Sequence, residues 1–430
     1  MGEGVLTTGF QRRNGELRCD DVSLRSIAAA VGTPSYVYSA AAVRDAYGRL
    51  ETALAGLPAH IHYAMKANSN LAVLRVLRAC GAGVDVVSSG ELHRALLAGF
   101  SGSQIVFAGV GKTRAELEHA LHVGVQCVNV ESEAELELLS HVAIARGAIV
   151  PVSLRINPGV ANVTAGHAYI ATGEAGSKFG IPLARGLKAA ARADALPGIE
   201  LVGLDMHIGS QIADVEAFAD AQRRLRGLLD GVRAAGITTI RSVDVGGGFP
   251  VAYHDAEPTA DLDGFARVLR DTFGDADVAL IVEPGRFLVA EAGVLLTEVL
   301  YRKESAPKHF MVVDAGMNDL LRPSHYAAYH EIEPVFESAA PLQVVDVVGP
   351  VCESGDFLAL NRSMPDVGAG TLLAVRNAGA YGYVMSSTYN SRPRPAEVLV
   401  EGDRWAIVAL RESQDDMVRL ERIAPDWRSA

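Results

Sequence analysis

The sequence has few cysteines, and no run of purely apolar residues is long enough to cross a bilayer. Its four cysteines in 430 residues lie far apart with no CxxC pair, which excludes a disulfide framework and a thiolate zinc site. Uncharged stretches at 26–43 and 156–173 are interrupted by Pro, Gly, Ser and Thr, so neither is typical of a transmembrane helix. The start, MGEGVLTTGF, lacks the basic flank and apolar block of a secretory signal. We therefore expect a cytoplasmic protein without a membrane partner.

Positive charge is also scarce. The 39 Lys and Arg residues stand against 51 Asp and Glu residues, a net charge of −12. This balance argues against nucleic acid or an anionic membrane surface as the main partner. With 430 residues, 49% of them hydrophobic, the chain has room for more than one domain. Any anionic ligand must therefore be held by a local group of side chains and backbone donors.

Between about residues 58 and 284, short Val- and Ile-rich runs alternate with longer segments of helical period, the pattern of parallel strands joined by crossover helices. The longer segments include 71–80, 113–123, 132–146 and 213–235. Eight such units in about 225 residues predict a closed (β/α)₈ barrel, with an open doubly wound sheet as the alternative. The eight runs are 61–65, 83–87, 105–108, 127–130, 150–156, 201–206, 242–245 and 279–282.

After residue 290 the pattern changes to strand-like runs separated by Gly, Pro, Asn and Asp, which predicts an all-β domain of sandwich or barrel type. The runs are 309–313, 341–348, 371–375 and 396–400. The first 38 residues hold little that folds alone, and Tyr36 to Tyr38 is suited to adding a strand to the β domain. We therefore expect an N-terminal segment 1–38 that joins the β domain, a barrel at 39–284 and a β domain at 285–430.

Charged and glycine-rich residues cluster at the ends of the barrel strands, which all open onto one face. Lys66 directly follows the first apolar strand, and a desolvated lysine there has a lowered pKa and can form an imine with an aldehyde. The triple glycine Gly246-Gly247-Gly248 allows backbone N–H groups to approach a phosphate. Glu283 is suited to holding a proton on a ring nitrogen. Together these features indicate pyridoxal phosphate.

Each feature also has a plain structural reading. Lys66 can be a lysine that extends to solvent from a strand end, the triple glycine a tight turn, and Glu283 the partner of Arg286. The combination of the three favours the cofactor site, because it is far less expected by chance than any one of them.

The chain resembles the fold-type III pyridoxal-phosphate decarboxylases, and within them the diaminopimelate decarboxylases, along nearly its whole length. The resemblance is carried by ordered motifs: YAMKANSN, VDVVSSGEL, NVESEAELELL, LRINPGV, SKFGIP, DMHIGSQI, VDVGGGFP, EPGRFLVAEAG, LRPSHYAAYHEI, GPVCESGDFLA and GAYGYVMSSTYNSRPRPAEVLV. The last four are typical of the diaminopimelate enzymes.

Carried over by position, the resemblance implies roles for individual residues. It makes Lys66 the imine-forming lysine, sets His207 against the ring face, and pairs Glu283 with the ring nitrogen. The other implied cofactor residues are Asp85, Arg155, Ser210, Gly246, Gly247, Gly248, Pro284, Gly285, Arg286 and Tyr381. The implied substrate contacts are Arg286, Arg322, Tyr326, Glu353 and Tyr381, with Cys352 as a proton donor. Outside the motifs, His207 reads as a core histidine, Arg322 as a surface charge and Cys352 as a small buried residue.

The implied reaction is decarboxylation of meso-2,6-diaminopimelate to L-lysine, the last step of lysine biosynthesis, in a homodimer with shared sites. Either Cys352 or Lys66 is suited to returning the final proton. Alternatives are a decarboxylase of the same fold for another basic or carrier-linked amino acid, a racemase, and a non-catalytic relative that binds the cofactor.

Overall fold

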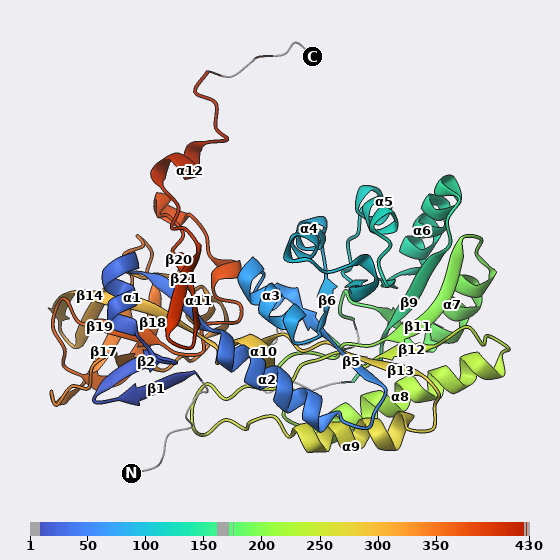
Figure 1. The fold of residues 1–430 in the computed structure, drawn as a ribbon, viewed down its shortest axis with the longest axis horizontal. Helices are drawn as coiled ribbons and strands as arrows, with labels where there is room; N and C mark the ends of the chain where they lie inside the picture. Colours follow the sequence, from blue (N-terminus) through green and yellow to red (C-terminus); the bar gives the residue numbers. More distant parts are fainter. Residues whose placement is uncertain (1–8, 161–171, 175, 425–426, 428–430) are drawn as a thin grey trace. The chain divides into compact units, whose positions relative to one another are not determined.

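The computed structural model describes residues 9–160, 172–174, 176–424 and 427, so the first eight residues of the predicted N-terminal segment lie outside it. The described chain forms two compact units, each followed along the sequence by colour in Figure 1. The barrel unit contains residues 40–292 and 379–381. The β unit contains residues 9–39, 293–378 and 382–430. Whether the chain divides into independent domains at 38/39 and 284/285 stays a prediction.

Within the described residues, the barrel unit has eight parallel strands that close into a ring. Closure depends on the pairing of the last barrel strand with the first: β13 pairs with β5, where Val282 lies opposite Ile61. The consecutive strands β8 and β9 also pair, which completes the ring. The closed barrel is therefore confirmed, and the open doubly wound sheet is wrong. The strands are β5 (Ala59–Ala64), β6 (Gly83–Val86), β7 (Ile105–Phe107), β8 (Cys127–Val130), β9 (Val150–Asn157), β11 (Ile199–Asp205), β12 (Ser242–Asp244) and β13 (Ala279–Val282). The short β10 (Ile181–Pro182) adds to β9.

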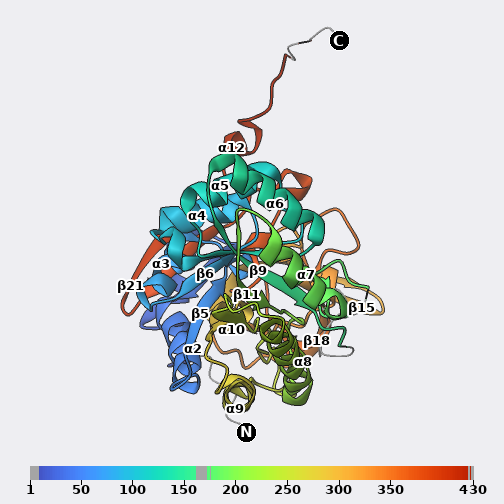
Figure 2. The same cartoon turned by 90° about the vertical axis from the view of Figure 1, so that its right-hand side faces the viewer.

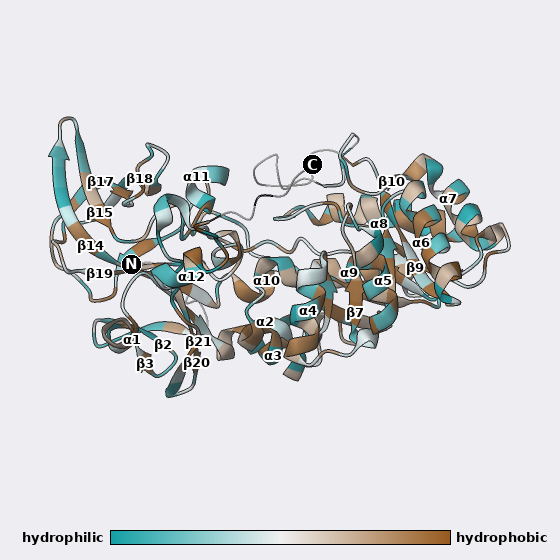
Figure 3. Ribbon diagram, turned by 90° about the horizontal axis from the view of Figure 1, so that it is seen from above, coloured by the Kyte–Doolittle hydropathy of each residue, from teal (hydrophilic) through white to brown (hydrophobic). Residues whose placement is uncertain are grey.

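Helices surround this ring, as the end-on view in Figure 2 shows. Several begin at polar caps that accept backbone N–H groups, for example Thr113 in a capping box with Glu116, and several end at left-handed glycines such as Gly124. Hydropathy alternates along them (Figure 3), because one face packs on the strands and the other meets solvent. They are α2 (Ala40–Ala53), α3 (Leu71–Ala79), α4 (Ser89–Ala98), α5 (Arg114–Val123), α6 (Glu133–Arg146), α7 (Leu183–Ala195), α8 (Val215–Ala234), α9 (Leu262–Phe273) and α10 (Arg286–Val289).

The β unit is built on a mixed sheet in which β14 (Gly293–Ser305) is central. The main path runs β18 (Phe357–Pro365), β17 (Leu342–Val348), β15 (Lys308–Val313), β14, β4 (Ser35–Ser39), β20 (Ala396–Glu401) and β21 (Arg404–Ala409). In addition, β19 (Leu372–Val375) pairs with β14 and with β16 (Ile332–Pro334). The four predicted strands are confirmed, and so is the strand containing Tyr36 to Tyr38. Four strands of this sheet were not predicted: β14, β16, β18 and β21.

The N-terminal segment forms its own small sheet within the β unit. This sheet consists of β1 (Phe10–Arg13), β2 (Glu16–Cys19) and β3 (Val22–Ser23), followed by α1 (Leu24–Val31). Phe10, Leu17 and Ile27 share one buried cluster with Val294 of β14 and Val398 of β20. The segment therefore buries its apolar side chains against strands from the other end of the chain, which explains why its sequence alone lacks a core. Two short helices, α11 (Arg322–Tyr326) and α12 (Gln414–Val418), complete the unit.

Helices able to span a membrane are absent from the described part of the chain, because none combines the necessary length with an apolar sequence.

Barrel closure also buries His62, a histidine that has no role in the predicted cofactor site. His62 on β5 is 4% exposed, and its ring packs so closely on β6 that a Cβ added to Gly83 would lie 2.6 Å from it. Burial lowers the pKa of His62 to about 4, helped by the charge of His60 and opposed by a hydrogen bond to the Val84 backbone. The folded state therefore holds this ring neutral, whereas the unfolded chain protonates it below about pH 6.5.

We predict that His62 makes the protein less stable at acid pH. Its stabilising contribution is fully present above the unfolded pKa and falls by about 2 kcal/mol between pH 8 and pH 5. Urea unfolding of wild type and His62→Gln at both pH values measures this difference, and the variant should lose about 2 kcal/mol less than wild type. His141→Gln, at an exposed position on α6, is the control. Equal losses in wild type and His62→Gln would contradict the prediction.

Candidate active site

A cavity lies at the carboxyl ends of the barrel strands, and the residues predicted at strand ends meet there. Lys66 follows β5, His207 follows β11, Gly248 follows β12 and Glu283 follows β13. The full lining is Ala64, Lys66, His207, Ser210, Gly248, Phe249, Glu283, Gly285, Arg286 and Tyr381. The structure thus brings together residues separated by more than three hundred positions in the chain.

Lys66 stands in a 3₁₀ turn, Met65–Ala67, directly after β5. Its Nζ lies 3.5 Å from Asp85 Oδ2, and the Asp85 side chain is 1% exposed. Burial alone would lower the pKa of Lys66, but the negative charge of Asp85, together with Tyr381 and Glu283, outweighs it and raises that pKa. The expectation of a lowered pKa is therefore wrong for this amine, because it was based on desolvation alone and did not include the neighbouring acids.

His207 is fixed by the glycine run beside it. Its Nδ1 accepts a hydrogen bond from the N–H of Gly247 at 3.2 Å. Burial, reinforced by the positive charges of Lys66 and Arg155, lowers the pKa of His207 well below its usual value. The ring is therefore neutral near pH 7 and carries its hydrogen on Nε2. The plain reading of His207 as a core histidine does not account for its exposure to the cavity.

The three consecutive glycines are required by close backbone packing. A Cβ on Gly247 would lie 2.0 Å from the carbonyl oxygen of Glu283, and one on Gly246 would lie 2.4 Å from that of Met206. Gly248 also has φ +95°, which side chains disfavour. The adjoining Pro284 accepts a hydrogen bond from the N–H of Ala64 at 3.0 Å. The loops after β12 and β13 are therefore locked to each other and to β5.

Arg286 holds the other side of the cavity. Its Nη1 donates to the Tyr253 hydroxyl at 2.7 Å, and its Nε and Nη2 lie 3.3 and 3.2 Å from Ser210 Oγ. The guanidinium also lies over the Tyr381 ring, 4.9 Å from its centroid. Tyr381 was expected to reach the site from the second domain, but residues 379–381 belong to the compact barrel unit. Its N–H donates to Ala67 beside the lysine, and its φ is +55°.

Beneath these residues lies a buried group of charges that sequence reasoning covered only in part. Arg155 on β9 donates to Glu131 at 2.8 Å, and its Nε is 4.0 Å from Asp205. Asp205, Asp244 and Glu283 are all buried, and their carboxylate oxygens lie within 4.8 Å of one another. Burial comes first among the causes that raise the pKa of each of these three acids.

Glu131, Asp205 and Asp244 were therefore missed. Their signal was available, because all three are acids at the carboxyl end of an apolar barrel strand or directly after it, in NVESE, LDMHIG and VDVGGG.

Glu283 itself is 5% exposed and forms no ion pair within the described residues, so the alternative that pairs it with Arg286 is wrong. No hydrogen-bond donor from these residues reaches its Oε1. A buried carboxyl oxygen beside a cavity, left without a donor, is suited to a ring nitrogen that carries a proton. This orphaned oxygen and the glycine-lined approach both fit pyridoxal phosphate.

The remaining predicted residues belong to the β unit. Arg322, in α11, is 6% exposed and its Nη1 lies 3.0 Å from His330 Nε2, so the reading as a solvated surface charge is wrong. The Tyr326 ring packs against His325 with centroids 4.6 Å apart. Cys352 is exposed, which rules out the reading as a buried packing residue. Its N–H donates to Asn390 Oδ1 at 2.7 Å, and Glu353 hydrogen-bonds Tyr389.

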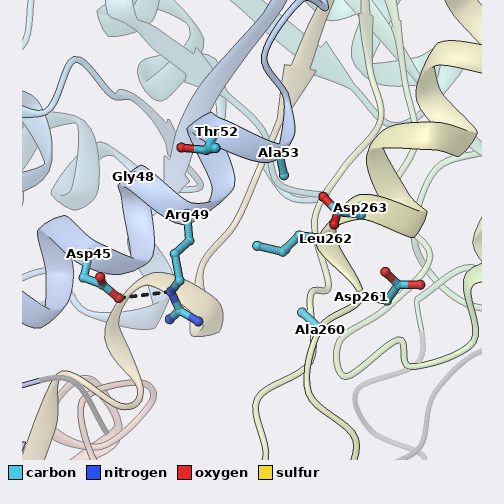
Figure 4. Close-up of a pocket in the computed structure, with 9 residues that line it drawn as sticks. All are labelled: Asp45, Gly48, Arg49, Thr52, Ala53, Ala260, Asp261, Leu262 and Asp263. Carbon is cyan, nitrogen blue, oxygen red and sulfur yellow. Dashed lines mark ion pairs between the residues drawn. The ribbon is translucent and has the colours of Figure 1, made fainter.

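A separate hollow lies on the outside of the barrel unit and contains none of the predicted residues. It is lined by α2 and by residues at the start of α9, with Arg49 paired to Asp45 at 3.0 Å (Figure 4). Its lining is Asp45, Gly48, Arg49, Thr52, Ala53, Ala260, Asp261, Leu262 and Asp263.

Comparison with known proteins agrees with this geometry. Residues 40–290 match the pyridoxal-binding domain of the pyridoxal-dependent decarboxylases, so the chain belongs to that class. It is 48% identical to the diaminopimelate decarboxylase of Pseudomonas aeruginosa, over 97% of this chain and 99% of that one. Within the class, the chain belongs to the diaminopimelate decarboxylase family.

Solved structures agree in fold. The diaminopimelate decarboxylase of Helicobacter pylori complexed with L-lysine is 39% identical with a TM-score of 0.88, over 92% of this chain and 98% of that one. The enzyme from M. jannaschii in co-complex with L-lysine is 34% identical with a TM-score of 0.91, over 97% and 99%.

We predict that Gly247→Ala weakens binding of the cofactor roughly 10- to 100-fold, because the new methyl group would force the loop away from Glu283. Absorbance titration with pyridoxal phosphate measures the dissociation constant. Gly227→Ala, in the middle of α8 with no atom within 4 Å of the added Cβ, is the matched control and should bind like wild type. Equal affinities for both variants would show that the close approach of Gly247 to Glu283 is not needed for cofactor binding.

Proposed function

We propose that the protein is a pyridoxal 5′-phosphate-dependent carboxy-lyase that converts meso-2,6-diaminopimelate into L-lysine and carbon dioxide. The observation that carries the proposal is the convergence of Lys66, His207 and Glu283 on one glycine-bordered cavity of the barrel. Similarity to diaminopimelate decarboxylases over nearly the whole chain supports the choice of substrate. When bound, the cofactor supplies an aldehyde for covalent attachment and a ring that accepts an electron pair.

Lys66 is the residue to which the cofactor would attach. Asp85, 3.5 Å from Nζ, holds the amine in position. The raised pKa of Lys66 means that the amine has to give up a proton before it can act as a nucleophile. The acids that raise this pKa also stabilise the ammonium form, so Lys66 can hold a proton at Nζ.

His207 would contact the face of the cofactor ring, and Glu283 would contact its nitrogen. A neutral His207, anchored through Nδ1, offers a flat uncharged face for stacking and adds no positive charge beside Lys66. Glu283 offers a carboxylate oxygen to the ring nitrogen. An anion there favours the protonated ring, which is the better electron acceptor. Asp85 and Arg155 would be the other two charged residues near the cofactor ring.

The phosphate would be held by backbone donors and Ser210. Gly246, Gly247 and Gly248 permit close approach of the loop after β12. The N–H groups of Gly246 and Gly247 donate to Asp244 and His207, so the backbone donors would be those of Gly248 and, following Pro284, of Gly285 and Arg286. Ser210 Oγ already lies within 3.3 Å of Arg286. This arrangement supplies hydrogen bonds to an anion in a chain whose net charge is negative.

Substrate recognition requires groups for the far amine and the far carboxylate. Arg286 and Arg322 would bind the carboxylate and Glu353 the ammonium, with Tyr326 and Tyr381 beside them. Cys352, exposed in the β unit, or Lys66 would return the proton after carbon dioxide leaves. A cytoplasmic homodimer with shared sites is the remaining part of this proposal.

The proposal is tested with the purified protein, pyridoxal phosphate and a panel of amino acids. We expect release of carbon dioxide from meso-diaminopimelate with L-lysine as product, and none from L-lysine or L-ornithine. Lys66→Ala should abolish release, whereas Lys188→Ala, at an exposed position on α7, should not change it. Release from ornithine but not from diaminopimelate would favour the other-substrate alternative, and release that is unchanged in Lys66→Ala would refute the proposal.

We predict that Arg322→Ala raises KM for diaminopimelate roughly 30-fold or more, because loss of a buried charged partner costs about 2–5 kcal/mol. Binding of the cofactor should stay within about threefold of wild type. Steady-state kinetics and absorbance titration measure the two effects separately. Arg404→Ala, whose side chain is 77% exposed, is the control. An unchanged KM would remove Arg322 from the substrate site.

A further inference from the structure

Two carboxyl groups meet in the floor of the cofactor cavity. Asp244 ends β12 and Glu283 follows β13, and these strands are neighbours in the barrel. One carboxylate oxygen of each lies within 4.8 Å of the other. Both residues are almost completely buried, at 2% and 5% exposure.

The cations of the site already have other partners. Lys66 lies against Asp85 at 3.5 Å, and Arg155 lies against Glu131 at 2.8 Å and Asp205 at 4.0 Å. Within the described residues, neither Asp244 nor Glu283 forms an ion pair. These two cations therefore act on the pair only from a distance: Arg155 lowers the pKa of Asp244 and Lys66 that of Glu283, but burial outweighs both effects.

Two ionised carboxylates are acceptors only and cannot hydrogen-bond each other. No donor from the described residues reaches Asp244 Oδ2 or Glu283 Oε1. The contact becomes a hydrogen bond only when one of the pair carries a proton, which also removes the repulsion between two buried charges. Burial raises the pKa of Asp244 to about 7 and that of Glu283 well above its usual value, in agreement with this requirement.

We infer that Asp244 is a positioning residue that holds one proton against Glu283, so that Glu283 can present a carboxylate to the cofactor's ring nitrogen. The inference rests on the proposed function and deepens it. In this arrangement the Asp244 O–H donates to Glu283, and the proton stays within the pair. Glu283 then keeps its negative charge for the ring nitrogen without a second bare charge beside it.

Asp244 also ties this pair to the phosphate loop. Its Oδ1 accepts the N–H of Gly246 at 2.9 Å, while the N–H of Glu283 donates to the carbonyl oxygen of Gly246 at 2.8 Å. One glycine is thus fixed from both sides by the two acids. A change at Asp244 should therefore affect both the phosphate end and the ring-nitrogen end of the cofactor site.

Other charged and titratable groups face the pair from the surrounding strands and set its proton occupancy. Those that contribute are Lys66 after β5, Asp85 on β6, Cys127 on β8, Arg155 on β9 and Asp205 on β11. Asp205 is the most similar to Asp244, since it is also 2% exposed and acidic. The two differ in their contacts: the Asp205 carboxylate lies 4.0 Å from Arg155 Nε, whereas that of Asp244 accepts the N–H of Gly246.

The test measures the dissociation constant and the absorption spectrum of pyridoxal phosphate bound to the full-length protein between pH 5.5 and 9. In wild type, affinity should fall as pH rises through about 7, by up to about tenfold per pH unit, because Asp244 loses the proton that it has to hold in the complex. Asp244→Asn keeps an oxygen for Gly246 and a permanent N–H donor for Glu283. Its affinity near pH 6 should stay within about threefold of wild type, and the transition near pH 7 should disappear.

Two further variants separate this role from a merely structural one. Asp244→Ala removes both hydrogen bonds and should weaken the cofactor roughly 10- to 100-fold at every pH. Asp205→Asn removes a neighbouring buried carboxyl and should retain the transition. An unchanged transition in Asp244→Asn, or wild-type affinity in Asp244→Ala, would overturn the inference and leave the proposed function standing. Wild-type protein that takes up no cofactor would overturn both.

Discussion

Closure of the parallel sheet on itself is the constraint on which the site depends. The ladder between β13 and β5 joins residues 280–282 to residues 59–61, and that between β8 and β9 joins the two halves of the ring. Because all eight strands point the same way, their carboxyl ends form one rim. Lys66 and Glu283 then line one cavity although 217 positions separate them. An open sheet with the same strands would not bring its first and last strands together.

The rim has an unusual electrostatic composition. Lys66 and Arg155 stand among five buried acids, Asp85, Glu131, Asp205, Asp244 and Glu283. Burial of unpaired charge is expensive, so the excess acids hold protons or acquire a partner. A cofactor with a protonatable ring nitrogen is such a partner. The same acids reverse the expected direction of the Lys66 pKa, which indicates that the charges of this site act as one coupled group.

The central strand of the β unit, β14, was not predicted from the sequence. β14 pairs with β15, β19 and β4, so it organises the sheet, yet its 13 residues end in a largely exposed polar stretch, YRKES, which lacks the apolar pattern of a strand. β4 comes from the N-terminal segment and pairs with both β14 and β20. Pairings of this kind depend on distant partners and leave little local signal.

The sequence by itself determined the alternation of strands and helices, because burial on both faces makes parallel strands continuous apolar runs and capping residues mark the helices. All eight barrel strands, the lysine after the first and the glycine run after the seventh could be read in this way. Only the tertiary structure decided which acids face one another, that Tyr381 packs with the barrel unit, and that Arg322 is buried. These properties depend on distances between residues far apart in the chain, and the charge that a buried group carries is determined by its neighbours in space.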